Sequence, residues 1–173
     1  MRRTHSHHAE AFDAIVRTHQ GAVRTFLRRL TRNSALADEL AQETFLTAFR
    51  TGETIATIRN MRSWLLRLAY RQFLDSHRRD KRRRDLAAGN AEPDEAGHND
   101  HGTRLDIARA MDSLPPERRA CAMLCLALGH SHGDAAQITG LPLGTVKSHV
   151  NRARTALQDR LSAYQNHIAG DAP

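Results

Sequence analysis

A stretch with almost no large apolar side chains divides the chain in two. Residues 80–103 begin with the basic cluster 81–84 and continue with Gly, Ala, Asn, Pro, Asp and Glu. Such a composition cannot bury enough surface to offset the conformational entropy lost on ordering. We therefore expect a flexible linker here, with a small domain on each side of it.

Both flanking stretches show apolar residues at helical spacing, and nothing in them suggests a strand or a repeat. Aromatic residues are only 5% of the chain, which favours small helical bundles with Leu, Ala, Val and Ile cores. We predict helices at about 9–31, 35–50, 61–79, 105–114, 117–128, 132–139 and 144–164. In the second of these, we expect the following residues to face inward: Leu36, Leu40, Phe45, Leu46 and Phe49.

The predicted fold class is therefore all-α, with two small helical domains joined by a flexible acidic linker. The first domain is expected at 9–79 and the second at 104–165, with short tails at 1–8, which we expect to be disordered, and at 166–173. The caps follow from local chemistry: Asn33 or Ser34 for the helix after 31, and Ser131 for the helix that ends near Thr139.

Charge is distributed unevenly along the chain. Residues 1–84 hold 18 basic and 8 acidic side chains, residues 85–103 hold 5 acidic and no basic ones, and residues 104–173 hold 8 basic and 6 acidic ones. A basic first half favours a polyanionic partner. No apolar run approaches the ~20 residues that cross a bilayer, and the N-terminus lacks the apolar stretch of a signal peptide. We expect a cytoplasmic protein with no membrane insertion of its own.

The segment from Gly140 to Arg154 has the pattern of a helix-turn-helix. Gly140 can end a helix in a left-handed conformation, and Pro142 interrupts helical hydrogen bonding in the turn. One face of the next helix is then apolar (Val146, Val150, Ala153, Leu157, Leu161), and the opposite face is polar (Lys147, Ser148, Asn151, Arg152, Thr155). Such a helix suits the major groove of DNA. The alternative is an ordinary amphipathic surface helix with solvated charges.

The cysteines and histidines give little sign of a metal site. Cys121 and Cys125 lie in an apolar stretch, where buried reduced thiols are expected. A metal site with His130 and His132 is conceivable, but this spacing matches no standard zinc pattern. His5, His7 and His8 could bind a metal loosely, although a disordered tail is the simpler interpretation. We expect no cofactor.

Several motifs together resemble the extracytoplasmic-function (ECF) sigma factors of bacterial RNA polymerase. The helix 37–50 is similar to the polymerase-binding helix of that family. Trp64-Leu65-Leu66-Arg67-Leu68-Ala69, with Asp75 and Arg78-Arg79, is similar to its promoter-melting and −10-reading helix. Leu114-Pro115-Pro116-Glu117-Arg118-Arg119 resembles the opening of its fourth region, and 144–154 resembles its −35-reading helix. The sequence departs from the family at four positions: Arg71, Ala135, Thr139 and His149.

This resemblance implies a transcription initiation factor that is not itself an enzyme. It would bind the β′ and β subunits of core RNA polymerase, read promoter DNA, and be controlled by an anti-sigma factor. Consistent with this, the sequence shows no Walker motif and no Ser-His-Asp arrangement. The main alternative is a stand-alone helix-turn-helix regulator, which explains residues 117–163 but not the acidic stripe in 37–50 or the helix that carries Trp64.

Three groups of candidate site residues follow. The polymerase-binding group is an acidic stripe with one aromatic residue: Asp38, Glu39, Gln42, Glu43 and Phe45. The −10 group is Arg59, Asn60, Arg62, Arg67, Tyr70, Arg71, Arg78 and Arg79. The −35 group is Arg118, Thr145, Lys147, Ser148, His149, Asn151, Arg152 and Arg154.

Each group has an expected chemistry. The acidic stripe would meet a basic helical surface, although such charges are often only solvated. Arginines of the −10 group would meet phosphates. We expect Tyr70 to be the exposed ring that stacks on an unpaired base, because Trp64 and Phe73 fall in the apolar phase of their helix. In the −35 group, Asn and Arg side chains can form paired hydrogen bonds with base edges.

Overall fold

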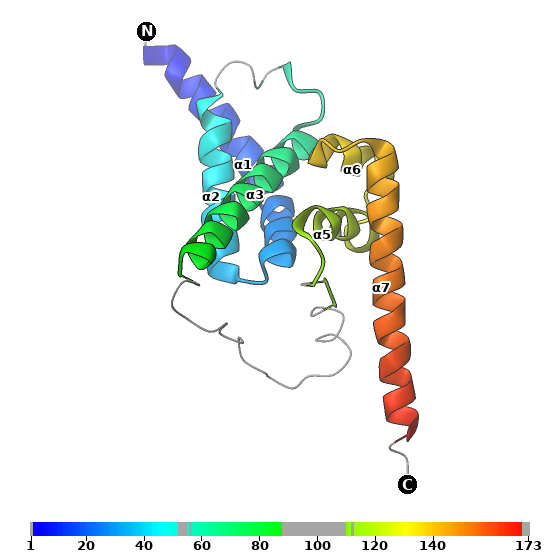
Figure 1. The fold of residues 1–173 in the computed structure, drawn as a ribbon. Helices are drawn as coiled ribbons and strands as arrows, with labels where there is room; N and C mark the ends of the chain where they lie inside the picture. The colour runs from blue at the N-terminus through cyan, green and yellow to red at the C-terminus, as the bar shows by residue number, and fades with distance from the viewer. Residues whose placement is uncertain (1, 52–54, 56, 88–109, 112, 171–173) are drawn as a thin grey trace.

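The computed structural model describes residues 2–51, 55, 57–87, 110–111 and 113–170, and these are helical apart from short connections (Figure 1). No strand occurs in these ranges. The all-α fold class with two helical units is confirmed. Most of the predicted linker, from residue 88 to 103, lies outside the described residues, as do residues 105–109 and 112 of the helix predicted at 105–114.

Helix α1 (Arg2–Thr31) starts before the predicted position at residue 9. The expectation of a disordered tail at 1–8 is not met for residues 2–8, which are helical. Residues 2–8 contain neither Pro nor Gly. Extending an existing helix through them adds a hydrogen bond for each residue that is fixed. The helix ends at Arg32, which adopts a left-handed backbone with φ of 53°.

Helix α2 (Ser34–Arg50) begins behind an Asn33 cap. The Oδ1 atom of Asn33 accepts a hydrogen bond from the backbone N–H of Leu36 at 3.0 Å, so the cap predicted at 33 or 34 is Asn33. Such caps satisfy one of the donors that a helix start leaves unpaired. Thr44 is fully buried in this helix, and its hydroxyl donates to the Leu40 carbonyl at 2.7 Å.

Helix α3 (Met61–Ala87) is longer than the predicted 61–79. The linker therefore does not begin at 80, since residues 80–87 continue the helix. Lys, Arg, Leu and Ala are good helix formers, and Asp80 forms an ion pair with Arg83 one turn later at 3.6 Å. These local preferences outweigh the lack of a core-facing stripe in this part of α3.

The core of the first domain lies between α1, α2 and α3, which pack against one another in pairs. Its largest fully buried side chains are Phe26, Leu27, Leu30, Leu65 and Leu66. Gln72 on α3 also donates a hydrogen bond to the Thr47 hydroxyl on α2 at 3.2 Å. These contacts fix the direction of the exposed faces of α2 and α3.

The second domain contains α5 (Pro116–Ala122), η2 (Met123–Ala127), α6 (His132–Thr139) and α7 (Leu143–Gly170). The single helix predicted at 117–128 is in fact an α-helical segment followed by the π-helical segment η2. The Leu128 N–H donates to the Met123 carbonyl five residues back, at 3.0 Å. Gly129 then ends the segment with φ of 72°.

The helix-turn-helix is formed by α6 and α7. Ser131 caps α6 as predicted: the Asp134 N–H donates to the Ser131 hydroxyl, and the Ser131 N–H donates back to the Asp134 carboxylate, both at 3.1 Å. Gly140 ends α6 with φ of 74°. Pro142 precedes α7, whose first turn closes with a hydrogen bond from the Val146 N–H to the Pro142 carbonyl. The helix-turn-helix predicted from Gly140 to Arg154 is thus confirmed.

The two domains pack against each other. Helix α3 contacts α6 and α5, and α1 contacts η2 (Figure 1). One cluster of buried apolar side chains spans both domains, from Leu65 and Tyr70 on α3 to Leu124 and Ile138 in the second domain. The exposed faces of α2, α3 and α7 therefore belong to a chain whose two domains are in contact.

Candidate functional site

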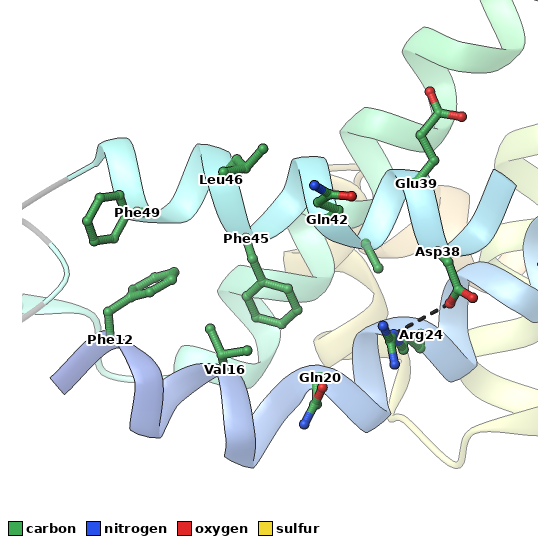
Figure 2. A pocket seen from close by; sticks show the side chains of 11 residues that line it. Phe12, Val16, Gln20, Arg24, Asp38, Glu39, Gln42, Phe45, Leu46 and Phe49 are labelled. Carbon is green, nitrogen blue, oxygen red and sulfur yellow. Dashed lines mark ion pairs between the residues drawn. The ribbon is translucent and has the colours of Figure 1, made fainter. Parts of the chain in front are cut away.

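A groove with a cavity volume of about 590 Å³ runs between α1 and α2. Figure 2 shows that its apolar side chains gather at one end and its charged side chains at the other. The apolar end is lined by Phe12 and Val16 from α1 and by Phe45, Leu46 and Phe49 from α2. The groove thus offers an apolar surface beside a polar one.

The apolar end of the groove is open to solvent. Leu46 is 41% exposed and Phe49 is 45% exposed, so the prediction that both face inward was wrong. Residues 45 and 46 are adjacent and lie about 100° apart on a helix, so one of them must turn away when the other faces the core. Phe49 is held by an edge-to-face contact with Phe12, with ring centroids 5.1 Å apart.

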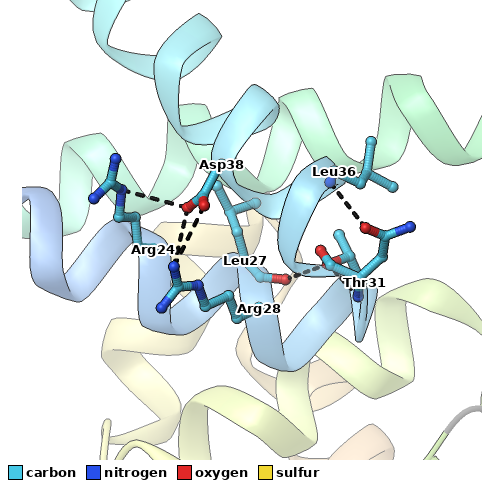
Figure 3. Close-up of polar contacts among 7 residues, drawn as sticks. Arg24, Leu27, Arg28, Thr31, Leu36 and Asp38 are labelled. Carbon is cyan, nitrogen blue, oxygen red and sulfur yellow. Dashed lines mark hydrogen bonds and ion pairs between the residues drawn. The ribbon is translucent and has the colours of Figure 1, made fainter.

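The acidic end of the groove contains Asp38 and Glu39 from α2. Asp38 is held by two arginines of α1: Arg24 Nε lies 3.5 Å and Arg28 Nη2 lies 3.3 Å from its Oδ1 atom (Figure 3). Glu39 is exposed and forms no ion pair with any residue that the structure describes. Glu39 therefore presents its negative charge to solvent, whereas Asp38 joins the two helices.

Of the remaining members of the polymerase-binding group, two line the groove and one lies beside it. Gln42 is exposed and lines the groove together with the half-buried Phe45. Glu43 lies outside the groove lining and pairs with Arg50, its Oε1 atom 3.6 Å from Arg50 Nη1. Four members of the predicted group therefore line the groove: Asp38, Glu39, Gln42 and Phe45. The residues that α1 contributes were missed, because the pairing of α1 with α2 is a tertiary contact that the sequence pattern does not show.

The −10 group is spread over two sides of α3. Arg67, Arg71 and Arg78 are exposed and recur at intervals of four and seven residues, which places them on one helix face. Arg78 pairs with Asp75 at 3.4 Å. Arg79 is also exposed, whereas Arg62 lines a pocket on another side of α3. Three arginines of the group therefore form one basic stripe.

The connection before α3 carries the other two members. Arg59 and Asn60 are both exposed, but the Oδ1 atom of Asn60 accepts a hydrogen bond from the Ser63 N–H at 3.0 Å. Asn60 therefore caps α3, which leaves its amide N–H₂ for an outside partner. Residues 52–54 and 56 of this connection lie outside the described residues.

Tyr70 is buried, with 2% of its surface exposed, so the prediction of an exposed stacking ring was wrong. Burial raises the pKa of its hydroxyl, and the nearby Glu117 and Cys121 of α5 raise it further. The residues that cover it come from the second domain, which periodicity within α3 cannot reveal. Phe73 is buried and Trp64 is half-buried against the core, as expected.

The predicted DNA-reading face of α7 is open. Val146, Val150 and Ala153 are buried, as the apolar stripe predicted. Outside this stripe, four residues of the −35 group are exposed (Lys147, Asn151, Arg152, Arg154) and two are half-buried (Thr145, Ser148). A helix with this polar face matches the shape of a major groove.

Two members of the −35 group are less accessible. Arg118 and His149 are half-buried, and the Nε atom of Arg118 and the Nδ1 atom of His149 are buried without a hydrogen-bond partner among the described residues. Burial lowers the pKa of His149, and Arg118 lowers it further. These two side chains come from α5 and α7 and lie close enough for Arg118 to affect the pKa of His149.

The cysteines are free thiols. Cys121 is fully buried and Cys125 is half-buried. Burial raises the pKa of Cys121 to about 12, which keeps it protonated and unreactive at neutral pH. Among the described residues, no group of three or more His, Cys, Asp or Glu side chains is placed to hold a metal ion, and no helix is long and apolar enough to cross a membrane.

Comparison with known proteins identifies both domains. The family model for Sigma-70 region 2 matches residues 15–83, and the model for Sigma-70 region 4 matches residues 104–157. The ECF RNA polymerase sigma factor SigE of Mycolicibacterium smegmatis is 35% identical over 170 residues, which cover 94% of this chain and 66% of SigE. EcfG of Rhodopseudomonas palustris is 33% identical over 139 residues, which cover 79% of this chain and 77% of EcfG. The chain belongs to the ECF sigma factors.

The fold agrees with this assignment. The sigma factor RpoE of Bartonella quintana, solved in complex with the anti-sigma factor NepR, superposes with a TM-score of 0.71 at 27% identity, over 88% of this chain and 98% of RpoE. An ECF sigma factor is a transcription initiation factor that directs RNA polymerase to promoters. Because both halves of this sigma factor match, the alternative of a stand-alone helix-turn-helix regulator leaves the first domain unexplained.

Proposed function

We propose that this sigma factor binds core RNA polymerase through the groove between α1 and α2. The groove combines exposed Leu46 and Phe49 with the exposed carboxylate of Glu39, inside a domain that is otherwise basic. A partner surface with apolar side chains and a basic residue would match both ends. An exposed apolar patch beside a charge is typical of protein interfaces. This juxtaposition is the observation that carries the proposal.

The basic stripe of α3 is proposed to hold the −10 strand of the promoter. Arg67, Arg71 and Arg78 can neutralise successive phosphates, and Arg59 lies just before the helix start. Arg62, Arg79 and the amide of Asn60 would extend this surface. Since Tyr70 is buried here, base stacking by its ring would first require the second domain to move.

Helix α7 is proposed to read the −35 element in the major groove. Asn151 and Arg152 are exposed and can form paired hydrogen bonds with adenine and guanine edges. Lys147, Ser148, Thr145 and Arg154 would bind phosphates or base edges nearby, and Arg118 and His149 would support the face. Polymerase and −10 binding are thereby assigned to residues 9–79, and −35 binding to residues 104–165.

Two further parts of the proposal follow from the family. The protein acts in the cytoplasm, and the polymerase supplies the catalysis. An anti-sigma factor controls it, because the structure superposes on a sigma factor that was solved with an anti-sigma factor bound. Control by such a partner would act on the closed arrangement of the two domains.

The test of polymerase binding is a charge reversal at Glu39, a better position than Asp38 because Asp38 holds α1 and α2 together. Glu39→Lys should lose core polymerase in a pull-down and lose core-dependent transcription, with an unchanged thermal unfolding temperature. The matched control is Asp85→Lys, an exposed carboxylate at the far end of α3. Equal binding by both variants would reject the groove as the polymerase site.

A further inference from the structure

A pocket of about 450 Å³ lies where α1 and α3 meet the connection between η2 and α6. Three basic side chains from three different elements line it: His19 on α1, Arg62 on α3 and His130 in the connection. Among the described residues, no carboxylate lines this pocket. Cavities of this size hold small ligands. The charge of the lining therefore indicates an occupant that is negatively charged and rich in hydrogen-bond acceptors.

Backbone geometry holds two of these side chains at the pocket. Gly129 adopts a left-handed conformation with φ of 72°, and the His130 N–H donates to the Leu124 carbonyl at 2.9 Å. His130 is thereby fixed directly after the end of η2. Arg62 lies in the first turn of α3 and forms no ion pair with any carboxylate that the structure describes. Its charge is therefore available to a ligand.

The three basic groups are close enough to affect one another. Burial lowers the pKa of His19 and of His130, and the charge of Arg62 lowers both further. Asp134 on α6 raises the pKa of His130, but its carboxylate is already held by the Ser131 hydroxyl at 2.7 Å. The Nε2 atom of His130 is buried without a hydrogen-bond partner among the described residues. An anion in the pocket would offset the repulsion and supply this partner.

The rest of the lining leaves room for an apolar group. Leu66 of α3 and Leu128 beside His130 contribute an apolar wall. Gly21, in the middle of α1, lines the same pocket, and a Cβ atom at this position would meet no atom within 4 Å. Glycine within a helix costs stability relative to alanine. A larger side chain at this position would take up pocket space without a steric clash.

We propose that this pocket binds a small phosphate monoester, with the phosphate held by Arg62, His19 and His130. Leu66 and Leu128 would contact the organic part of the ligand. Arginine and protonated histidine form short, charge-assisted hydrogen bonds with phosphate oxygens. A metal ion is a poorer match, because the guanidinium repels a cation and no group of three or more His, Cys, Asp or Glu side chains in the described ranges is placed to hold one. The inference does not depend on the assignment of α3 to the −10 strand.

Phenyl phosphate is the probe, because it joins a phosphate to an apolar ring. Titrated into the free chain without DNA or polymerase, it should bind saturably and shift the imidazole NMR signals of His19 and His130. Arg62→Gln should raise its Kd at least about tenfold, the effect of losing a hydrogen bond between charged groups. The matched control is Arg71→Gln, an exposed arginine of α3 outside the pocket, which should bind like wild type. Gly21→Leu should also weaken binding, because its side chain would occupy the pocket while leucine keeps the helix.

Binding should also depend on pH. Sulfate keeps its double negative charge across this range, so a change in its affinity reports on the protein alone. The affinity should rise as the pH falls from about 7.5 to about 5.5, because a bound anion favours protonated His19 and His130. In the free chain Arg62 opposes protonation of His130 and Asp134 favours it. His130→Gln should reduce the rise, whereas His132→Gln, outside the pocket, should not.

Four results would overturn the proposed pocket. They are binding like wild type by both Arg62→Gln and Gly21→Leu, an equal loss in Arg71→Gln, a sulfate affinity that does not change with pH, and displacement of phenyl phosphate by a single-stranded −10 oligonucleotide. The last result would show that the phosphate site belongs to the DNA-binding surface. Selective loss in Arg62→Gln, with no displacement by the oligonucleotide, is the result that the proposal predicts.

Discussion

Truncation of Leu46 tests the groove between α1 and α2 through its apolar end. Complete burial of a leucine side chain contributes about 1.5–3 kcal/mol. Leu46 is 41% exposed, so the part that a partner can still bury corresponds to about 0.6–1.2 kcal/mol. Leu46→Ala should therefore raise the Kd for core polymerase about three- to eightfold.

The assay is a titration of fluorescently labelled core polymerase with the purified sigma factor at fixed salt. Leu143→Ala is the matched control, because Leu143 is 47% exposed but lies at the start of α7 in the second domain. The apolar contribution is nearly independent of salt, in contrast to that of Glu39. Equal affinity for Leu46→Ala, Leu143→Ala and wild type would show that the polymerase does not bury the exposed apolar end of the groove.

Three other predictions concern DNA reading, stability and pH. Asn151→Ala should weaken binding to the preferred −35 sequence by about 1–3 kcal/mol while changing binding to mismatched sequences little; a uniform loss across a promoter library would show that Asn151 reads no base. Leu124→Ala should lower the free energy of unfolding by about 2–5 kcal/mol in urea titrations, because Leu124 is fully buried. Leu126→Ala, at a 41% exposed position, should lower it much less. Similar losses of unfolding free energy in the two variants would contradict the assigned core. Burial lowers the pKa of His130 in the folded protein, so the free energy of unfolding should decline as the pH falls below ~6.5. The decline should be smaller in His130→Gln than in His132→Gln, because His130 lines the pocket beside Arg62 and the neighbouring His132 does not.

Features set by a few neighbouring residues could be predicted from the sequence. The Asn33 and Ser131 caps, the left-handed Gly140 and the apolar stripe of α7 each depend on chemistry within a short stretch of chain. The acidic stripe of α2 was found for the same reason. Local signals of this kind survive in the folded protein because tertiary packing does not compete with them.

Features that depend on contacts between distant segments could not be predicted. Tyr70 lies on the polar side of its own helix by periodicity, but α5 covers it. The groove between α1 and α2 depends on the pairing of the two helices, in which Phe12 contacts Phe49. The π-helical segment η2 ends at Ala127, whose carbonyl accepts a hydrogen bond from Arg29 of the first domain. In each case the decisive partner is far away in the sequence, where no periodicity points to it.

In vitro transcription with purified core RNA polymerase is the decisive test of the proposed function. We predict that the sigma factor with core polymerase initiates at defined start sites that share a −10 and a −35 element, and that Glu39→Lys abolishes this initiation. Absence of initiation by the wild-type protein with core polymerase, or full initiation by Glu39→Lys, would contradict the proposal.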